Sequence, residues 1–358
     1  MNEQRNKVLK LLEEGHITSE EAEKLLDALD QDQDQHKKQS ETDYEENKDS
    51  FKGIKKDLKS FTDGIINFID DTIQRVKEGP FEFTFNHVNV KRQYDYSADG
   101  INQFNFDLTN SSVEFIISTS NEVKVEMNGK VYKEDDQSRA EETFDDTFSI
   151  GVTNDTLHID QKQKNVSAEI IIYLPEKKYE QAYIKTINGG VKSRQLNINI
   201  ARITSINGSI RLDQYEGDSV YVETKHGSIR LDNAELSQAK LETTTGSVYY
   251  DGHIEHLDID VTTGSLRTYL RNLDIKRVDL NTTTGSTQLY LPKNIKVKGH
   301  ANTSVGSIDV NLPDVVVEKM DERMVKKTVQ FYNATEDDPY LDVDIETKTG
   351  SIKVNTVN

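Results

Sequence analysis

Apolar and polar residues alternate with a period of two on both sides of a glycine that recurs through the second half of the chain. Mostly aliphatic residues stand seven and five positions before this glycine and two after it, as Ala182, Ile184 and Val191 do around Gly189. Such alternation predicts two short strands per repeat, each with one buried face. The recurring glycines are Gly189, Gly208, Gly227, Gly246, Gly264, Gly285, Gly306 and Gly350.

The spacing of these glycines is 19, 19, 19, 18, 21, 21 and 44 residues. A period near 20 is typical of a solenoid and is too short for a helical crossover, so successive coils should stack strand on strand in parallel. The last interval holds either two repeats or one repeat with an insertion. The sequence therefore predicts a mainly β protein, a parallel β-solenoid of about 20 residues per coil.

The phrase Thr-x-x-Gly-Ser around most of these glycines is interpreted as the corner of a coil. Glycine adopts positive φ without a Cβ clash, which suits a sharp change of direction. The threonine and serine beside it are expected to stack as ladders of hydroxyl groups along the solenoid. In this interpretation the repeated residues have a structural role and take no part in catalysis.

Residues 1–30 predict a small helical hairpin, and residues 31–50 predict an acidic flexible linker. Gly15 ends the first helix, and Thr18 with Glu21 has the spacing of a capping box at the start of the second. Helices this short bury little surface alone, so the hairpin should dock on a partner or on a second copy. Its docking residues are expected to be Leu11, Leu12, Ile17, Leu25 and Leu26.

Residues 51–79 predict an amphipathic helix with lysines in its first half. Two interpretations remain open. The helix either packs on protein or lies in a membrane interface with its lysines at anionic headgroups. Asp57, Asp63, Asp70 and Asp71 dilute the basic face and favour protein packing. The expected contact residues are Phe51, Lys52, Ile54, Lys55, Leu58, Lys59, Phe61, Ile65 and Phe68.

Residues 80–358 are assigned to the solenoid, because Gly79-Pro80 stops the helix and strand patterns follow at once, beginning at 81–85. Residues 80–180 are expected to form irregular capping coils with a polar excursion at 133–146. Regular coils are expected over 181–358, with an insertion at about 313–340 that contains a strand at 329–332. A solenoid needs such atypical ends, because an open strand edge pairs with other chains.

The formal net charge of −19 and the absence of cysteine narrow the class of protein further. A general nucleic-acid binder requires a basic surface, and disulfides or thiolate metal sites require cysteine. No apolar run approaches the roughly 20 residues of a membrane span, and the first residues lack the pattern of a secretory signal. We expect a cytoplasmic protein, peripheral at the inner face of the membrane, with surface exposure left open.

A search for catalytic chemistry gives one acidic row and one histidine pair. Asp213, Asp232 and Asp251 each stand five residues after a corner glycine, close to Arg211 or Arg230. Polysaccharide-degrading β-helices use acids and bases on one coil face, but outward charges on solvated strands explain this row better. His253 and His256 lie in an extended segment, where such spacing does not bring two ligands together. We expect no catalytic, metal-binding or cofactor-binding residues, and no cofactor.

The segments Ile171–Pro175 and Ile184–Gly189, followed by Thr-Thr-Gly-Ser corners, resemble the bacterial adhesin-like β-solenoid domain of unassigned function. Residues 8–26 resemble the short SHOCT-like helical domain that precedes it in YvlB- and LiaX-like proteins of Gram-positive bacteria. The family has no established catalytic residues, so the resemblance transfers none.

This resemblance implies a role in the cell-envelope stress response. We expect a non-enzymatic adaptor or sensor that docks to membrane-associated protein partners and oligomerises through its helical elements. The alternative is a surface-displayed adhesin or a module that binds antimicrobial peptides. A carbohydrate-active β-helix enzyme ranks third.

Overall fold

The computed structural model describes residues 87–323, 326–335 and 339–357. The predicted helical hairpin, the linker, the amphipathic helix and the strand at 81–85 lie outside the described residues. In the part that is described, no helix is long and apolar enough to cross a membrane.

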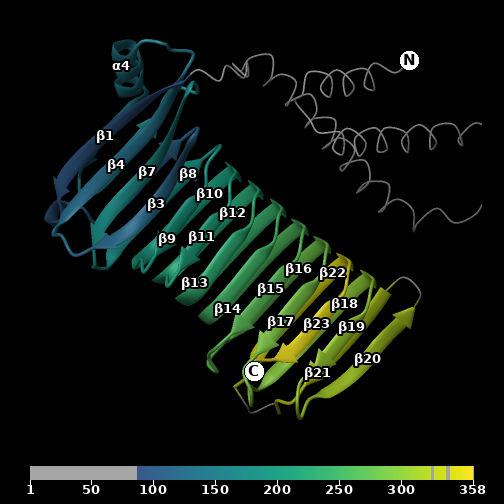
Figure 1. Cartoon of the computed structure of the whole chain (residues 1–358). Helices are drawn as coiled ribbons and strands as arrows, with labels where there is room; N and C mark the ends of the chain where they lie inside the picture. The colour runs from purple at the N-terminus through teal and green to yellow at the C-terminus, as the bar shows by residue number, and fades with distance from the viewer. Residues whose placement is uncertain (1–86, 324–325, 336–338, 358) are drawn as a thin grey trace, which may run out of the picture. The chain divides into compact units, whose positions relative to one another are not determined.

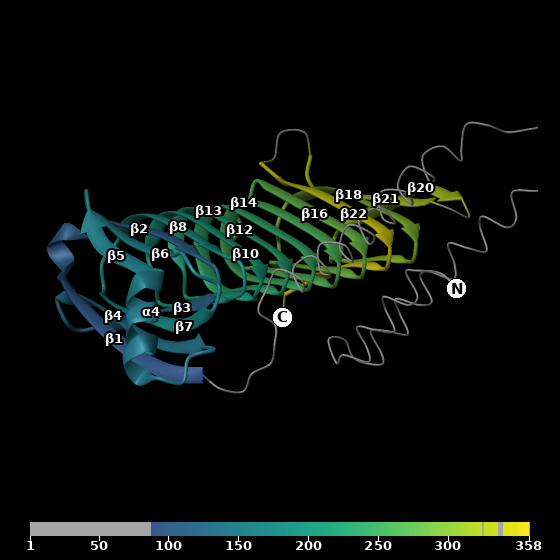
Figure 2. The same cartoon turned by 90° about the horizontal axis from the view of Figure 1, so that it is seen from above.

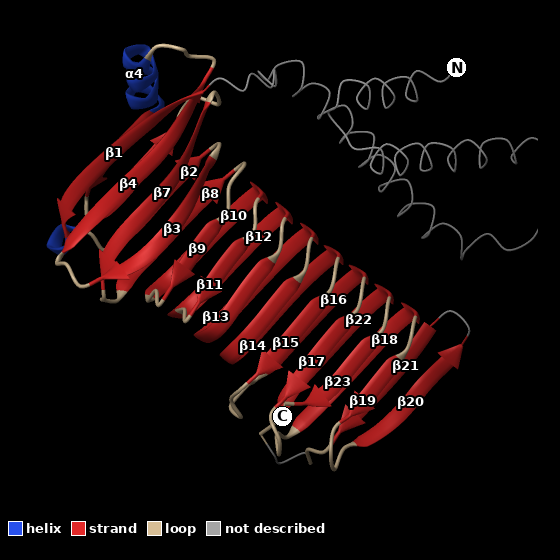
Figure 3. Ribbon diagram, viewed as in Figure 1, coloured by secondary structure: helices blue, strands red, loops and turns tan. Residues whose placement is uncertain are grey.

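Strands dominate the described chain (Figure 3). In chain order the elements are β1 (His87–Ser97), the 3-10 helix η1 (Ala98–Gly100), β2 (Gln103–Leu108), β3 (Ser111–Ser118), β4 (Glu122–Tyr132), α4 (Gln137–Thr147), β5 (Phe148–Thr153), β6 (Thr156–Gln161), β7 (Val166–Pro175), β8 (Tyr179–Thr186), β9 (Val191–Arg194), β10 (Ile198–Asn207), β11 (Ile210–Asp213), β12 (Glu216–His226), β13 (Ile229–Thr245), β14 (Val248–Thr263), β15 (Leu266–Leu270), β16 (Arg277–Thr284), β17 (Thr287–Leu291), β18 (Val297–Val305), β19 (Ile308–Asn311), β20 (Val316–Arg323), β21 (Lys326–Tyr332), β22 (Leu341–Thr349) and β23 (Ile352–Thr356).

These strands form two sheets that enclose one core (Figures 1 and 2). The first sheet runs β5, β6, β2, β8, β10, β12, the second halves of β13 and β14, then β16, β22, β18, β21 and β20. The second sheet runs β1, β4, β7, β3, β9, β11, the first halves of β13 and β14, then β15, β17, β23 and β19. Pairing between coils is parallel, and the predicted β-solenoid is confirmed.

Inward side chains stack in register from coil to coil. Ile203, Val222, Leu241, Ile259 and Leu280 occupy one such row in the first sheet. Each is at most 3% exposed. Burial of one aliphatic side chain against the next removes apolar surface from water all along the solenoid, at about 25 cal/mol per Å². The core is therefore continuous, and each coil depends on its neighbours.

The last coil in the sequence is not the last coil in the stack. Strand β22 lies between β16 and β18 in the first sheet, and β23 lies between β17 and β19 in the second. The expectation that successive coils stack in chain order is therefore wrong at this end. The inserted position buries both flanks of the coil, and Val343, Ile345, Ile352 and Val354 are fully buried as a result.

The interval of 44 residues before Gly350 contains an antiparallel hairpin. Strands β20 and β21 pair with each other, and β21 pairs with β18. Phe331 of β21 fills the space above Gly299, where a Cβ atom would lie 2.1 Å from the phenyl ring. Gly299 stands at a position that is aliphatic in other coils, so the hairpin supplies the apolar side chain that this coil lacks.

At the N-terminal end of the stack, too, the order of the strands differs from their order in the sequence. Strand β2 lies between β6 and β8, and β3 lies between β7 and β9. Antiparallel strands β5 and β4–β1 then extend the two sheets outward. The segment interpreted as a polar excursion at 133–146 contains all of the helix α4 except its last residue, and sequence reasoning missed this helix.

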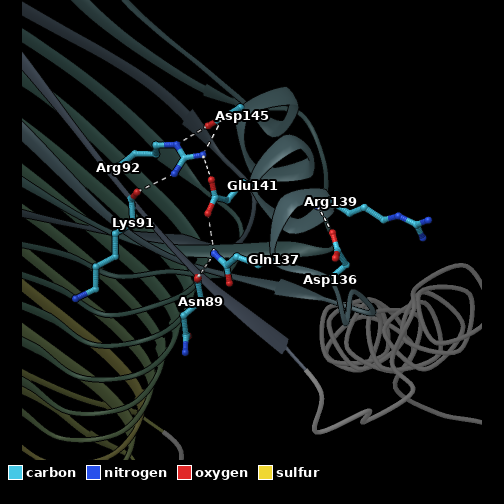
Figure 4. A network of polar contacts seen from close by, with 8 residues as sticks. All are labelled: Asn89, Lys91, Arg92, Asp136, Gln137, Arg139, Glu141 and Asp145. Atoms are coloured by element: carbon cyan, nitrogen blue, oxygen red, sulfur yellow. Dashed lines mark hydrogen bonds and ion pairs between the residues drawn. The ribbon is translucent and has the colours of Figure 1, made fainter.

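Helix α4 is tied to β1 by a polar network (Figure 4). Arg92 of β1 donates two hydrogen bonds, at 2.8 and 2.9 Å, to the carboxylate of Asp145 and lies 3.4 Å from Glu141. Asp136 caps the helix by accepting a hydrogen bond from the backbone N–H of Arg139 at 2.9 Å. Phe144 on the inner face of α4 is fully buried. The helix therefore covers the strands beneath it with one apolar face.

Candidate functional surfaces of the solenoid

The corner glycines are required mainly by close approach of neighbouring coils. A Cβ atom on any of the eight would lie between 1.7 and 2.2 Å from a backbone carbonyl oxygen of the adjacent coil. Only five also have φ in the left-handed region, between +142° and +155°: Gly246, Gly264, Gly285, Gly306 and Gly350. The expected positive φ is therefore wrong for Gly189, Gly208 and Gly227, where the lack of space excludes a side chain.

Most hydroxyl groups three residues before these glycines bond to backbone, whereas those of Thr282 and Thr347 bond to the hydroxyl of Thr287. Ser205, Thr224 and Thr243 each donate to the carbonyl of the corner glycine in the preceding coil, at 2.9 Å. Val261 interrupts this series in the next coil. The serines after the glycines form a second ladder, in which Ser209 accepts from the N–H of Ser228 at 3.2 Å. The first ladder satisfies partly buried polar groups of the corners, whereas the serine ladder is exposed.

Two acidic rows run across the outer surface of the first sheet, at the half of the stack nearer its C-terminal end. Asp258, Asp279 and Asp344 are in register on β14, β16 and β22. Asp260 and Glu346 lie in the next outward row. We call these five residues the acidic rows. Sequence reasoning missed them, although three of them stand six residues before Gly264, Gly285 and Gly350.

The carboxylates in the acidic rows differ in how they are compensated. Arg277 donates to both carboxylate oxygens of Asp279, at 2.7 and 2.9 Å. Burial raises the pKa of Asp258, and neighbouring Asp260 adds to the increase. Burial also raises the pKa of Asp344, with Asp279 as the second cause. The surroundings thus disfavour the charged forms of Asp258 and Asp344, the two residues that flank Asp279.

The same sheet carries a better compensated carboxylate one coil earlier. Burial alone would raise the pKa of Glu242, but hydrogen bonds from Lys240 and Tyr221 outweigh it and lower the pKa. Lys240 lies 2.9 Å from Glu242, and the Tyr221 hydroxyl donates to it at 2.7 Å. Lys240 also lies 3.5 Å from Asp258, so the first member of the acidic rows shares this lysine with Glu242.

Replacing Asp344 by Asn is expected to stabilise the protein at pH 7. A carboxyl whose pKa is raised by folding favours the folded state only when protonated, so its penalty develops as pH rises through the folded-state pKa. We expect the melting temperature to rise by about 1–3 °C at pH 7. The gain should vanish below about pH 4, where aspartate is also protonated in the unfolded chain.

Thermal melts of the wild type and the variant across this pH range provide the measurement. The matched variant Asp279→Asn loses its hydrogen bonds from Arg277 and should not gain stability at pH 7. Equal stabilisation by both substitutions would contradict the assignment.

The acidic row proposed for the enzyme alternative lies on the outer surface of the second sheet. Arg230 donates to both oxygens of Asp232, at 2.5 and 2.6 Å. Arg271 donates to both oxygens of Asp251, at 2.6 and 2.7 Å. Asp213 lies 3.7 Å from Arg194. Each carboxylate is therefore engaged by an arginine in an ion pair, which supports the interpretation as outward charge on solvated strands.

His253 and His256 lie on β14 with exposed side chains. Within residues 87–323, 326–335 and 339–357, no group of three or more His, Asp or Glu side chains is placed to hold a metal ion. The docking hairpin and the amphipathic-helix residues predicted from sequence lie outside these ranges.

Two sheets with in-register outward ladders around one core define the class of this protein, a β-solenoid. The chain belongs to the Toastrack DUF4097 family, whose model matches residues 101–355. A SHOCT-like domain model matches residues 3–34. The predicted order, a SHOCT-like domain followed by the solenoid, is confirmed.

A similar protein is "Uncharacterized protein YvlB" of Bacillus subtilis (strain 168), which is 24% identical over 207 residues. The match spans about half of each protein, 55% of this chain and 56% of the relative.

Two solved structures match about three quarters of the chain. A "putative adhesin" of Bacteroides fragilis is 10% identical, with coverage of 75% and 97% and a TM-score of 0.42. A "putative lipid binding protein" of Parabacteroides distasonis is 12% identical, with coverage of 75% and 97% and a TM-score of 0.38. At these values the likeness carries no argument about function.

Proposed function

We propose that this protein is a non-enzymatic docking scaffold of the bacterial cell-envelope stress response. The observation that carries the proposal is a rigid stack of coils whose first sheet presents the acidic rows on a flat outer surface. Such a surface suits a partner with a basic, extended face, because complementary charge accelerates encounter and fixes register. The envelope-stress assignment rests on the resemblance to YvlB- and LiaX-like proteins.

The expected partner is a membrane-associated protein with a basic segment next to the membrane. The scaffold would then work at the inner face of the membrane, and the SHOCT-like domain would contribute oligomerisation or a second contact. Weak contacts at two sites of one chain reinforce each other through effective concentration.

A second candidate function is the binding of cationic peptides on the acidic rows. The same observation favours it, since a bound cationic peptide would stabilise the charged forms of Asp258 and Asp344, which burial disfavours. This function requires the protein outside the cell, whereas the scaffold requires it inside. Cell fractionation separates the two candidates.

The test of the scaffold is a crosslinking pull-down with the full chain, from cells with and without envelope stress. The variant Asp258→Asn/Asp344→Asn/Glu346→Gln should lose at least tenfold of a captured membrane protein. The control Asp107→Asn/Asp213→Asn/Asp309→Asn removes the same charge away from the acidic rows and should retain it. Equal capture by both variants would remove the acidic rows from the proposal, and a bulk extracellular location would favour peptide binding.

A further inference from the structure

A row of cations runs along the outer surface of the second sheet. The positions three residues after each corner glycine are in register through β9, β11, β13, β14, β15, β17 and β23. They are occupied by Lys192, Arg211, Arg230, Tyr249, Arg267, Gln288 and Lys353. We call the five lysine and arginine residues among them the cationic row. At the strand spacing of about 4.8 Å, the row extends over about 29 Å.

The cationic row is bounded at each end by an acidic residue, and three of its cations are free to contact a ligand. Glu114 on β3 and Asp309 on β19 occupy the next register positions on either side. Lys192, Arg211 and Lys353 are exposed. No carboxylate in the part of the chain that the structure describes forms an ion pair with these three. Their charges are therefore available to a ligand.

The outermost layer of this surface is cationic because arginines cover the carboxylates of the neighbouring row. The side chain of Arg194 is 76% exposed and that of Asp213 is 32% exposed. The corresponding values are 41% for Arg230 and 21% for Asp232. A ligand that approaches the second sheet meets guanidinium groups before carboxylates, although the whole chain carries a net charge of −19.

Two members of the cationic row are held in position by their neighbours. The Arg230 guanidinium lies over the Tyr249 ring, 3.9 Å from its centroid. Arg267 donates a hydrogen bond to Gln288 at 3.2 Å. Contacts of this kind fix long side chains before a ligand binds and reduce the entropy lost on binding.

We propose that the cationic row binds a linear polyanion laid along the axis of the solenoid. The row is one residue wide except beside Lys192. The next outward positions on the same strands, about 7 Å away, hold Arg194, Asp213, Asp232, Asp251, Tyr269, Tyr290 and Asn355. The three carboxylates among them are already paired with arginines, so a planar anionic membrane that covered both rows would gain attraction mainly from the narrow cationic row. A linear polymer with charges along its backbone contacts the cationic row alone, so the geometry favours a polymer over a membrane.

The test uses the full chain and long-chain inorganic polyphosphate, with binding measured at about 50 mM salt, where screening is modest. The variant Lys192→Gln/Arg211→Gln/Lys353→Gln should bind at least tenfold more weakly. These three side chains have no ion-pair partner within the described residues, so their replacement should leave the fold intact, which a thermal melt checks. The control Lys185→Gln/Lys240→Gln/Lys298→Gln removes equal charge from the first sheet and should change affinity less than twofold.

Three results would overturn this assignment. One is equal weakening by both triple variants, since net charge would then control binding. Another is the absence of polyphosphate binding, or competition by orthophosphate at the same phosphate concentration. The third is tighter binding to anionic lipid vesicles than to polyphosphate, which would make the surface a membrane contact. The pull-down proposed above tests the other sheet, so either proposal can fail alone.

Discussion

Replacing Gly246 by Ala is expected to destabilise the stack of coils by about 3 kcal/mol or more. Two costs add at this position. The new Cβ would lie 2.0 Å from the carbonyl oxygen of Gly227, and φ is +152°, a conformation that residues with a side chain rarely adopt. The three nearest atoms are all backbone atoms of the adjacent coil, so the methyl group has no flexible neighbour to displace. Because the coils share one core, the damage should spread beyond this corner.

Thermal melts should show a decrease of about 6 °C or more. Gly151→Ala is the matched control, since a Cβ there meets nothing within 4 Å, and it should melt close to the wild type. Gly227→Ala separates the two costs. Its Cβ would lie 2.2 Å from the carbonyl of Gly208, but its φ is not positive. A Gly246→Ala protein that melts like Gly151→Ala would contradict the close approach of the coils.

The length of a coil was predictable from sequence because each coil repeats the same local requirements. Every coil has a glycine where the backbones of neighbouring coils meet. Every coil also has inward aliphatic residues at fixed distances from this glycine, as around Gly208 and Gly246. The order of the coils was not predictable in this way. Coils with the same pattern of inward residues fit next to one another in several orders. The inward residues Val343 and Ile345 suit the neighbouring coils both in chain order and in the observed order.

The second corner of each coil carried a weaker signal. Gln195, Gln214 and Asn233 take positive φ, from 51° to 56°, six residues after a corner glycine, whereas the next coil is one residue shorter and its Gly252 pairs with Ala234. Asparagine and glycine tolerate this conformation well, whereas glutamine gives little indication of it. The corner therefore becomes visible only when the coils are aligned with one another.

The outward surfaces could be predicted only in part. Asp213, Asp232 and Asp251 were found because their spacing of 19 residues is regular. Asp344 belongs with Asp258 and Asp279, but a 44-residue interval and an exchanged coil order separate it from them along the sequence. The shared offset of six residues before a corner glycine indicates that these residues lie in one row, but strand pairing decides which members of the row become neighbours.

The missed helix α4 leads to the last prediction, that Phe144→Ala will open the N-terminal end of the stack. Phe144 is fully buried, packs over Gly129 of β4 and lies 4.9 Å from the ring of Phe148. Removing a buried phenyl ring and leaving a cavity costs about 3–5 kcal/mol. The hydrogen bonds from Arg92 to Asp145 are exposed and cannot offset this loss, because surface ion pairs contribute about 1 kcal/mol or less.

The effect should be local, unlike that of Gly246→Ala. Hydrogen exchange of the full chain should become faster in β1 and β4, which α4 contacts. Exchange in β10 to β14 should stay unchanged, since those coils retain both neighbours. Glu142→Ala, on the exposed face of the same helix, should leave both regions as in the wild type. Faster exchange throughout the stack in Phe144→Ala would show that the end coils and the middle coils unfold as one unit, and the local role of α4 would be wrong.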